Sequence, residues 1–355
     1  MLELLASLLA ILGGGLHHAG PVRIAEPRPF EVWDGVLRGR APDVVHVRVR
    51  GRRYTLYPGA GGRFTVRVPQ IGTGDTIVAV AGRRIPVYAL PGGSLRPLAP
   101  ARNDRRLDRA LRTLAARTTP AVAAYVHRAD GGAGAWNAGA EFEGASTLKL
   151  PIMLTALERI GGEPRASAYW GPFEAITRFS SNEAADEVLE RLGGTEEGGA
   201  ADMVEAMHRL GLFHTYLYGG YLTDPDAGGG PPPVRIDRTP PPSFKYTTAA
   251  DMARLAAWLA DAAAGSGPLT HRGVSRHEAR ELLYLMVHAA DPGLVRAGAG
   301  GRPVAHKIGW LETSRDDVAV IFTHRGPVVV TVYAQGAIDT SVYEFGRAAA
   351  RAALR

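Results

Sequence analysis

Two patterns of apolar and polar positions divide the chain near residue 92. Before that point, short segments such as VVHVRVRG and DTIVAVAG alternate apolar and polar residues and end at glycine or proline. Alternation with a period of two, broken by turn residues at short intervals, is typical of an antiparallel β-sandwich. We therefore predict a small all-β domain over residues 21–92, immunoglobulin-like in general style and without a catalytic cluster.

The second region, residues 104–355, follows a linker at 93–103 that contains proline and glycine. A helix is predicted over about 105–117, then two strands in AVAAYVHRAD and AGAWNAGA, then an alanine-rich helical stretch from 146 to about 264. Three late strands, in RPVAHKIGW, DVAVIFTHRG and PVVVTVYAQG, precede a closing helix over about 341–355. One sheet built from both ends of the region, with a helical subdomain inserted, is an α+β arrangement.

The first 20 residues form a short apolar segment, MLELLASLLAILGGGLHHAG. It is too short to cross a bilayer comfortably, so we expect no stable membrane span. It is similar to the hydrophobic part of a secretion signal, although a basic start is missing and Glu3 interrupts it. We expect an extracytoplasmic protein, secreted or held in the cell envelope.

Composition excludes some kinds of site and favours others. The chain has no cysteine, which excludes disulfides, thiol nucleophiles and thiolate metal sites. Its net charge is +6, but the arginines are scattered and no basic and aromatic motif of a nucleic-acid-binding module occurs, so we expect no nucleic-acid partner. Only three of the 41 basic residues are lysines: Lys149, Lys245 and Lys307. Lysine, unlike arginine, can lose its proton when desolvated, so Lys149 and Lys307 are candidates for proton transfer or for a site that needs a compact ammonium group.

The stretch GASTLKL places Ser146 three residues before Lys149 at the start of a predicted helix. Residues i and i+3 share a helix face, so the lysine amine can reach the hydroxyl and activate it as a nucleophile. The alternative is a serine that caps the helix, although a capping box would have Glu or Gln at position 149. On this motif alone, the cap is the better interpretation.

Two later motifs are equally ambiguous when taken singly. Ser180, Ser181 and Asn182 precede an amphipathic helix, where serine and asparagine commonly serve as caps. Lys307 lies on a predicted strand in VAHKIGW, where an edge lysine usually prevents aggregation. Gly309 on that strand would let a ligand approach closely.

In this order, the three motifs resemble the signatures of class A β-lactamases and penicillin-binding proteins, SxxK, SxN and KxG. The flanking segments TLKLPIMLTALERI, SNEAADEVLERLGG and YTTAADMARLAAWL are also similar to that family. The resemblance covers about residues 100–355 and none of the N-terminal domain. It implies a β-lactamase/transpeptidase-like fold, with an antiparallel sheet flanked by helices and an inserted all-α subdomain. It also implies an enzyme without a metal or organic cofactor, and we expect a monomer.

The resemblance implies a role for each matching position in acyl transfer. Ser146 would attack a carbonyl and form an acyl-enzyme, with Lys149 as the base. Ser180 would relay a proton to the leaving nitrogen, and Lys307 would hold that hydroxyl and attract a substrate carboxylate.

Three further positions would bind the substrate. Asn182 would bond its side-chain amide, and Gly309 and Trp310 would line the site. The backbone N–H groups of Trp310 and of Ser146 would form the oxyanion hole.

Three departures from the family pattern concern the substrate and the removal of the acyl group. Ser181 stands where aspartate is usual, and Ile308 replaces the threonine or serine that binds the substrate carboxylate. No glutamate occurs from residue 206 to 277, so the usual deacylating base is missing from the loop at 221–244. Asp224, Asp226 and Asp237 are candidate substitutes, although solvated turn residues are the simpler interpretation.

The sequence thus predicts a serine acyl hydrolase that attacks a β-lactam or a D-alanyl-type amide, with a small-molecule or peptidoglycan-like substrate. The alternative is a catalytically weak or inactive protein of the same fold that binds a cell-wall component. The altered strand motif and the missing glutamate favour the alternative. The complete set Ser146, Lys149, Ser180, Asn182 and Lys307 favours the enzyme.

Overall fold

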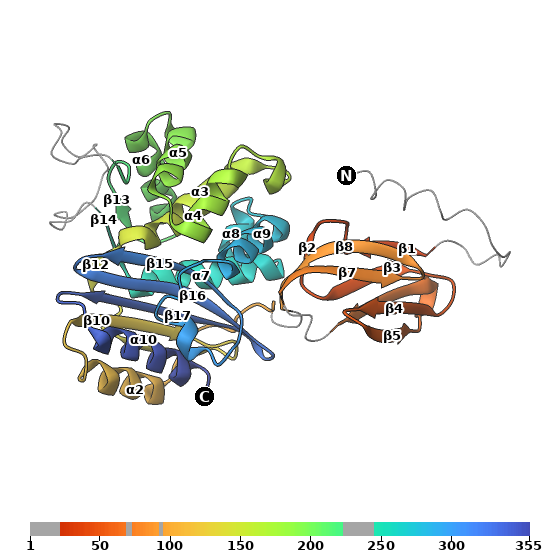
Figure 1. The fold of residues 1–355 in the computed structure, drawn as a ribbon, viewed down its shortest axis with the longest axis horizontal. Coiled ribbons are helices and arrows are strands. Elements are labelled where there is room, and N and C mark those ends of the chain that lie inside the picture. Colours follow the sequence, from red (N-terminus) through yellow and green to blue (C-terminus); the bar gives the residue numbers. More distant parts are fainter. Residues whose placement is uncertain (1–21, 69–72, 92–94, 223–244) are drawn as a thin grey trace.

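The computed structural model describes residues 22–68, 73–91, 95–222 and 245–355. They form an all-β N-terminal domain beside a larger domain made of a central sheet and helices (Figure 1). The apolar segment at 1–20 and the three candidate aspartates, Asp224, Asp226 and Asp237, lie outside these residues. None of the helices described is both long and apolar enough to cross a membrane.

The N-terminal domain consists of two sheets that share one core. The alternation that predicted its strands is clear in β4 (Val45–Val49), whose three valines are buried while His46 and Arg48 are exposed. Buried side chains from both sheets pack together between them. The immunoglobulin-like label remains a prediction. The three-stranded sheet has the order β1 (Arg23–Glu26), β3 (Val36–Arg40), β6 (Arg63–Arg67), and the five-stranded sheet has the order β2 (Val32–Trp33), β8 (Arg83–Ala89), β7 (Gly74–Val80), β4, β5 (Arg52–Leu56), with a short 3₁₀ turn η1 (Ala60–Gly62) before β6.

The larger domain has the predicted α+β architecture, with one sheet built from both ends of the region. Its early strand β10 pairs with its last strand β17, as Tyr125 opposite Thr331 illustrates. Strand β15, which carries Lys307, is an edge strand of this sheet. The order is β15 (Val304–Leu311), β16 (Ser314–Thr323), β17 (Gly326–Gln335), β10 (Ala121–His127), β11 (Gly132–Trp136), β9 (Arg102–Asn103).

Helices cover both faces of this sheet (Figure 1). The first and last helices of the domain share a core with one face, and the inserted helices share a larger core with the other. The first group is α2 (Arg105–Ala115) and α10 (Thr340–Ala353), with the 3₁₀ turn η4 (Arg296–Gly298) against α10. The second group is α3 (Lys149–Ile160), α4 (Trp170–Phe179), α5 (Asn182–Gly193), α6 (Glu196–Arg209), α7 (Ala249–Ala264), α8 (Pro268–His271) and α9 (Arg276–Val287), with the 3₁₀ turns η2 (Ala145–Leu148) and η3 (Pro164–Ala166).

A second, three-stranded sheet was not predicted. It has the order β12 (Glu141–Glu143), β14 (Lys245–Thr248), β13 (Tyr216–Leu217). Strands of two to four residues show too little alternation for a periodicity to reveal them. This sheet positions the site, because the Gly144 amide donates a hydrogen bond of 2.7 Å to the Lys245 carbonyl, just before Ser146.

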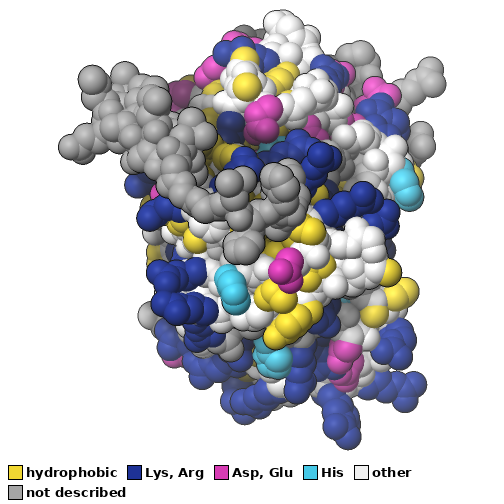
Figure 2. All heavy atoms as spheres, turned by 90° about the vertical axis from the view of Figure 1, so that its right-hand side faces the viewer, with side chains coloured by type: hydrophobic (Ala, Val, Ile, Leu, Met, Phe, Trp, Pro, Cys, Tyr) yellow, Lys and Arg dark blue, Asp and Glu magenta, His cyan; other side chains and the backbone are white. Residues whose placement is uncertain are grey.

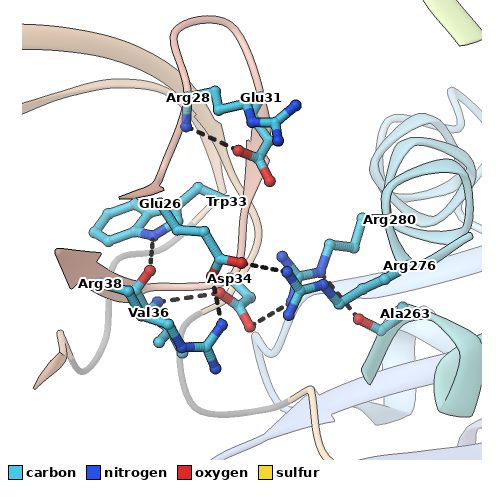
Figure 3. Close-up of polar contacts among 10 residues, drawn as sticks. All are labelled: Glu26, Arg28, Glu31, Trp33, Asp34, Val36, Arg38, Ala263, Arg276 and Arg280. Carbon is cyan, nitrogen blue, oxygen red and sulfur yellow. Dashed lines mark hydrogen bonds and ion pairs between the residues drawn. The ribbon is translucent and has the colours of Figure 1, made fainter. Parts of the chain in front are cut away.

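The two domains meet through buried charges as well as apolar side chains. Asp34 of the N-terminal domain accepts a hydrogen bond of 2.7 Å from Arg280 of α9, with side chains only 7% and 3% exposed. Beside this pair, Glu26 bonds Arg276 of the same helix (Figure 3). Part of the predicted linker also packs here, because Leu98 joins the core of the larger domain.

Candidate active site

Ser146 lies in the 3₁₀ turn η2, which leads directly into α3 at Lys149, three residues later. The preceding residue, Ala145, has a φ of 41°, a left-handed conformation that residues with a Cβ adopt rarely. Tyr221 supports this strained turn, because its hydroxyl donates a hydrogen bond of 3.0 Å to the Ala145 carbonyl. Strain of this kind persists where surrounding contacts hold it, often at active sites.

Lys149 is completely buried beneath this turn. Its Nζ donates hydrogen bonds of 2.6 Å to the Ser180 carbonyl and 2.6 Å to Asn182 Oδ1, and none to Ser146 Oγ. Burial lowers the pKa of Lys149 to about 7; the Asp186 carboxylate opposes this shift and the Lys245 cation adds to it. A substantial fraction of Lys149 is therefore neutral near pH 7, as a general base requires.

Ser180 and Lys307 form the second polar pair of the site. Ser180 ends α4 in a left-handed conformation, with a φ of 58°, which turns the chain toward α5. Lys307 Nζ donates hydrogen bonds of 2.7 Å to Ser180 Oγ and 2.9 Å to the Ile308 carbonyl. Burial and the Lys149 cation hold the pKa of Lys307 well below its usual value. The structure thus joins the second and third sequence motifs directly.

Gly309 and Trp310 follow Lys307 on the edge strand. A Cβ atom at Gly309 would lie 2.8 Å from Asp316 Oδ2 and 3.1 Å from Ala145 Cβ, so the glycine allows β15 to pack against the η2 turn. The side chain of Trp310 is 63% exposed, and the Arg315 guanidinium lies 4.6 Å from its ring centre. Seven residues predicted for the site thus come from η2, α3, the end of α4, the start of α5 and β15.

Tyr221 belongs to this site and was not predicted. Its ring centre lies 4.3 Å from Lys149 Nζ and 4.7 Å from Lys245 Nζ, within the range of cation–π contacts. Asp186 of α5 fixes this segment, because its two carboxylate oxygens accept the backbone N–H groups of Tyr221 at 2.6 Å and Leu222 at 2.9 Å. Burial raises the pKa of Tyr221 well above its usual value, so the phenol keeps its proton.

Lys245 and Asp186 were also missed. Lys245 Nζ donates a hydrogen bond of 2.9 Å to the Gly220 carbonyl, and burial lowers the pKa of Lys245. The sequence carried a signal for Lys245, namely the rarity of lysine in a chain rich in arginine. The structure gathers all three lysines of the chain in one site. Asp186 also had a signal, since it follows Asn182 by four residues and so lies on the same face of α5.

A group of possible metal ligands lies at the domain junction. Within the described parts of the chain, the acidic and histidine side chains with suitable geometry are Glu163, His277 and Glu281. Arg165 already binds the Glu281 carboxylate through two hydrogen bonds, of 3.1 and 2.7 Å. This arrangement is an ion-pair network that joins α9 to η3.

A family model described as the β-lactamase enzyme family matches residues 175–355, just over half of the chain. The chain belongs to the β-lactamase enzyme family. The match includes Ser180, Asn182 and Lys307 but begins after Ser146 and Lys149. No curated protein matches the chain.

Solved structures of the β-lactamase family share the fold. PBP-A, solved as a mutant in an acyl-enzyme complex with penicillin G, is 21% identical, with a TM-score of 0.57 over 72% of this chain and 97% of its own. A β-lactamase from Xanthomonas campestris is 18% identical, with a TM-score of 0.53 over 70% and 96%. An ancestral class A β-lactamase is 22% identical, with a TM-score of 0.53 over 70% and 98%. These likenesses confirm the predicted β-lactamase/transpeptidase-like fold.

Proposed function

We propose that the protein hydrolyses an amide through an acyl-enzyme on Ser146, with Lys149 as the base. The observation that carries this proposal is the environment of the Lys149 amine. A neutral amine has two N–H donors and one lone pair. The hydrogen bonds to the Ser180 carbonyl and Asn182 Oδ1 use both donors, so the lone pair is free to accept the Ser146 proton.

Acylation then proceeds in two steps. Ser146 Oγ bonds to the carbonyl carbon while its proton moves to Lys149, and the carbonyl electron pair moves onto oxygen. The backbone N–H groups of Ser146 and Trp310 stabilise this oxyanion. When the C–N bond breaks, the proton taken by Lys149 reaches the leaving nitrogen through the Ser180 hydroxyl, which Lys307 orients.

The substrate class follows from the groups that line the site. Asn182 accepts from Lys149 through Oδ1, so its N–H₂ group remains to donate to an amide carbonyl of the substrate. We infer a β-lactam or a D-alanyl-type amide, encountered outside the cytoplasm. Penicillin G in the acyl-enzyme of PBP-A supports this class. Ile308 supplies no hydroxyl for the substrate carboxylate, which leaves that interaction to Lys307 and Ser180.

Slow release of the acyl group is part of the proposal. The carboxylate oxygens of Asp186 bond backbone amides, and Tyr221 covers Lys149 as a neutral phenol. Neither is positioned to take a proton from an attacking water. Because the sequence also has no glutamate from residue 206 to 277, we expect the adduct to be long-lived.

Intact mass measurement after incubation with a fluorescent penicillin tests the proposal. We expect one adduct on Ser146, abolished in Ser146→Ala and in Lys149→Met. Glu187→Gln, an exposed change on α5, is the matched control and should label normally. Absence of any adduct on the unaltered protein, together with no ester hydrolysis, would refute the proposal.

Ile308 favours a second function, in which the fold binds a cell-wall component without chemistry. In that case Ser146→Ala would bind peptidoglycan fragments as tightly as the unaltered protein. The unaltered protein would then form no covalent adduct with them.

A further inference from the structure

The net positive charge of the chain resides entirely in its N-terminal domain. Residues 21–92 contain 12 arginines, no lysine and five acidic residues, which is a net charge of +7. Residues 93–355 contain 29 basic and 29 acidic residues, and Glu3 accounts for the remaining charge. A charge asymmetry of this size between domains indicates an anionic partner for the basic one.

The acidic residues of the N-terminal domain are also segregated in space. Three of the five bond the larger domain: Glu26, Asp34 and Asp75, through Arg276, Arg280 and Tyr284. The surfaces turned away from the junction therefore retain most of the arginines and few acids. Figure 2, which looks onto this end of the molecule, shows basic side chains gathered along its edges and sparse acidic ones.

On the five-stranded sheet, three arginines lie in register across the strands. Arg53 of β5 lies opposite Arg48 of β4. Ala79 of β7 lies opposite Arg48 on its other side and opposite Arg84 of β8, so the row runs across four strands. All three arginines are exposed, and paired residues point to the same face. With adjacent strands about 4.8 Å apart, the row spans roughly 15 Å.

The three-stranded sheet carries a second row of the same kind. Arg23 of β1 is paired with Arg40 of β3, which is paired with Arg63 of β6, and all three are exposed. Among the residues that the structure describes, none of the six arginines in the two rows makes an ion pair. Three pairs of arginines lie directly opposite one another: Arg48 and Arg53, Arg23 and Arg40, and Arg40 and Arg63. Like charges in this position destabilise a sheet, so a bound anion would stabilise both sheets.

We propose that the N-terminal domain docks a linear, phosphate-bearing polyanion across these two arginine rows. One guanidinium group can donate two parallel hydrogen bonds to two oxygens of a phosphate. A row of arginines can therefore bind successive phosphates along a flexible chain. The rows lie on the outer faces of two packed sheets, so a flat bilayer cannot contact both, whereas a polymer can. No aromatic residue belongs to either row, and the exposed Tyr57 and Phe30 lie outside them, so the rows themselves offer no base-stacking platform of the kind that a single-stranded nucleic-acid site uses.

Binding of inorganic polyphosphate to the full chain, measured across a salt series, tests this inference. One variant carries Arg48→Gln, Arg53→Gln and Arg84→Gln; another carries Arg23→Gln, Arg40→Gln and Arg63→Gln. The matched control removes three exposed arginines from the C-terminal end, with Arg347→Gln, Arg351→Gln and Arg355→Gln. We expect each row variant to bind at least about 10-fold more weakly, with the log–log salt slope reduced by roughly one for each arginine that contacts a phosphate.

Two further measurements make the result decisive. The midpoint of thermal unfolding should stay level or rise in the row variants, because repulsion is relieved, and penicillin labelling of Ser146 should be unchanged. If the control variant loses as much affinity for polyphosphate as the row variants do, net charge alone explains the binding and the proposal is overturned. Tighter binding of single-stranded DNA, polyglutamate or anionic phospholipid vesicles than of polyphosphate would overturn it as well. Labelling of Ser146 is scored separately, so failure of either proposal is distinguishable.

Discussion

Lys149 Nζ lies 4.3 Å from the centre of the Tyr221 ring, so the proposed base is covered by a neutral aromatic side chain. The Tyr221 hydroxyl already donates to the Ala145 carbonyl, and burial raises its pKa well above the usual value. It can therefore shape the site without serving as a second base. This relationship agrees with the proposal that Ser146 is acylated and that the adduct is released slowly.

Replacement of Tyr221 by glutamate should place a carboxylate beside Lys149 that can act as a deacylating base. We expect Tyr221→Glu to shorten the lifetime of the Ser146 adduct by at least about 10-fold, because a carboxylate beside Lys149 can take a proton from water. The measurement is loss of adduct mass after excess penicillin is removed. Tyr221→Gln has the same size without the base and should not accelerate release. Equal lifetimes in the two variants would show that another step limits release.

The pH dependence of labelling should report the ionisation of Lys149. The neutral amine is the active form, so the labelling rate should rise with pH through about 7. The Lys245 cation disfavours a proton on Lys149, so Lys245→Met should raise the pKa of Lys149. The rise would then move to higher pH, and labelling at pH 7 would slow.

Lys245→Arg keeps the positive charge and is the control for that experiment. Its pH midpoint should stay close to that of the unaltered protein. If both variants share one midpoint, the charge of Lys245 does not influence Lys149.

Substitutions of the adjacent Ser180 and Ser181 should have different effects, one on the acylation rate and the other on the free energy of unfolding. Ser180→Gly preserves the left-handed backbone but removes the hydroxyl bonded to Lys307, and should slow acylation roughly 100-fold. Ser181 instead caps α5 by accepting from the Ala184 amide. Ser181→Ala should lower the free energy of unfolding by about 1 kcal/mol and leave the labelling rate nearly unchanged. The reverse pattern in labelling rates would contradict the proposed proton relay.

The junction between the domains should depend on the buried pair of Asp34 and Arg280. Asp34→Asn leaves the guanidinium buried without its counter-charge, and should lower the free energy of unfolding by about 3 kcal/mol in chemical denaturation. The double variant Asp34→Leu with Arg280→Met removes both charges and should lose less than the sum of the single changes.

An exposed ion pair provides the comparison. Glu187 and Arg191 are paired one turn apart on the surface of α5. Glu187→Gln should change the free energy of unfolding by less than about 0.5 kcal/mol. A similar cost for both acidic residues would show that the Asp34 pair is not insulated from solvent.

Most of the fold was predictable because its signals are local. Alternation with a period of two marked β4 and β7, and helical spacing marked α2 and α5. The small sheet escaped prediction because strands as short as β13 carry no readable period, and their pairing depends on distant parts of the chain.

The sequence by itself determined the family motifs, the order of the elements and the candidates Ser146, Lys149, Ser180, Asn182 and Lys307. Only the tertiary structure showed that Tyr221 covers Lys149 and that Lys245 lies beside it, since burial and through-space charge depend on segments far apart in sequence. The arginine rows are a similar case. Arg48, Arg53 and Arg84 look scattered along the chain, and only strand register places them side by side.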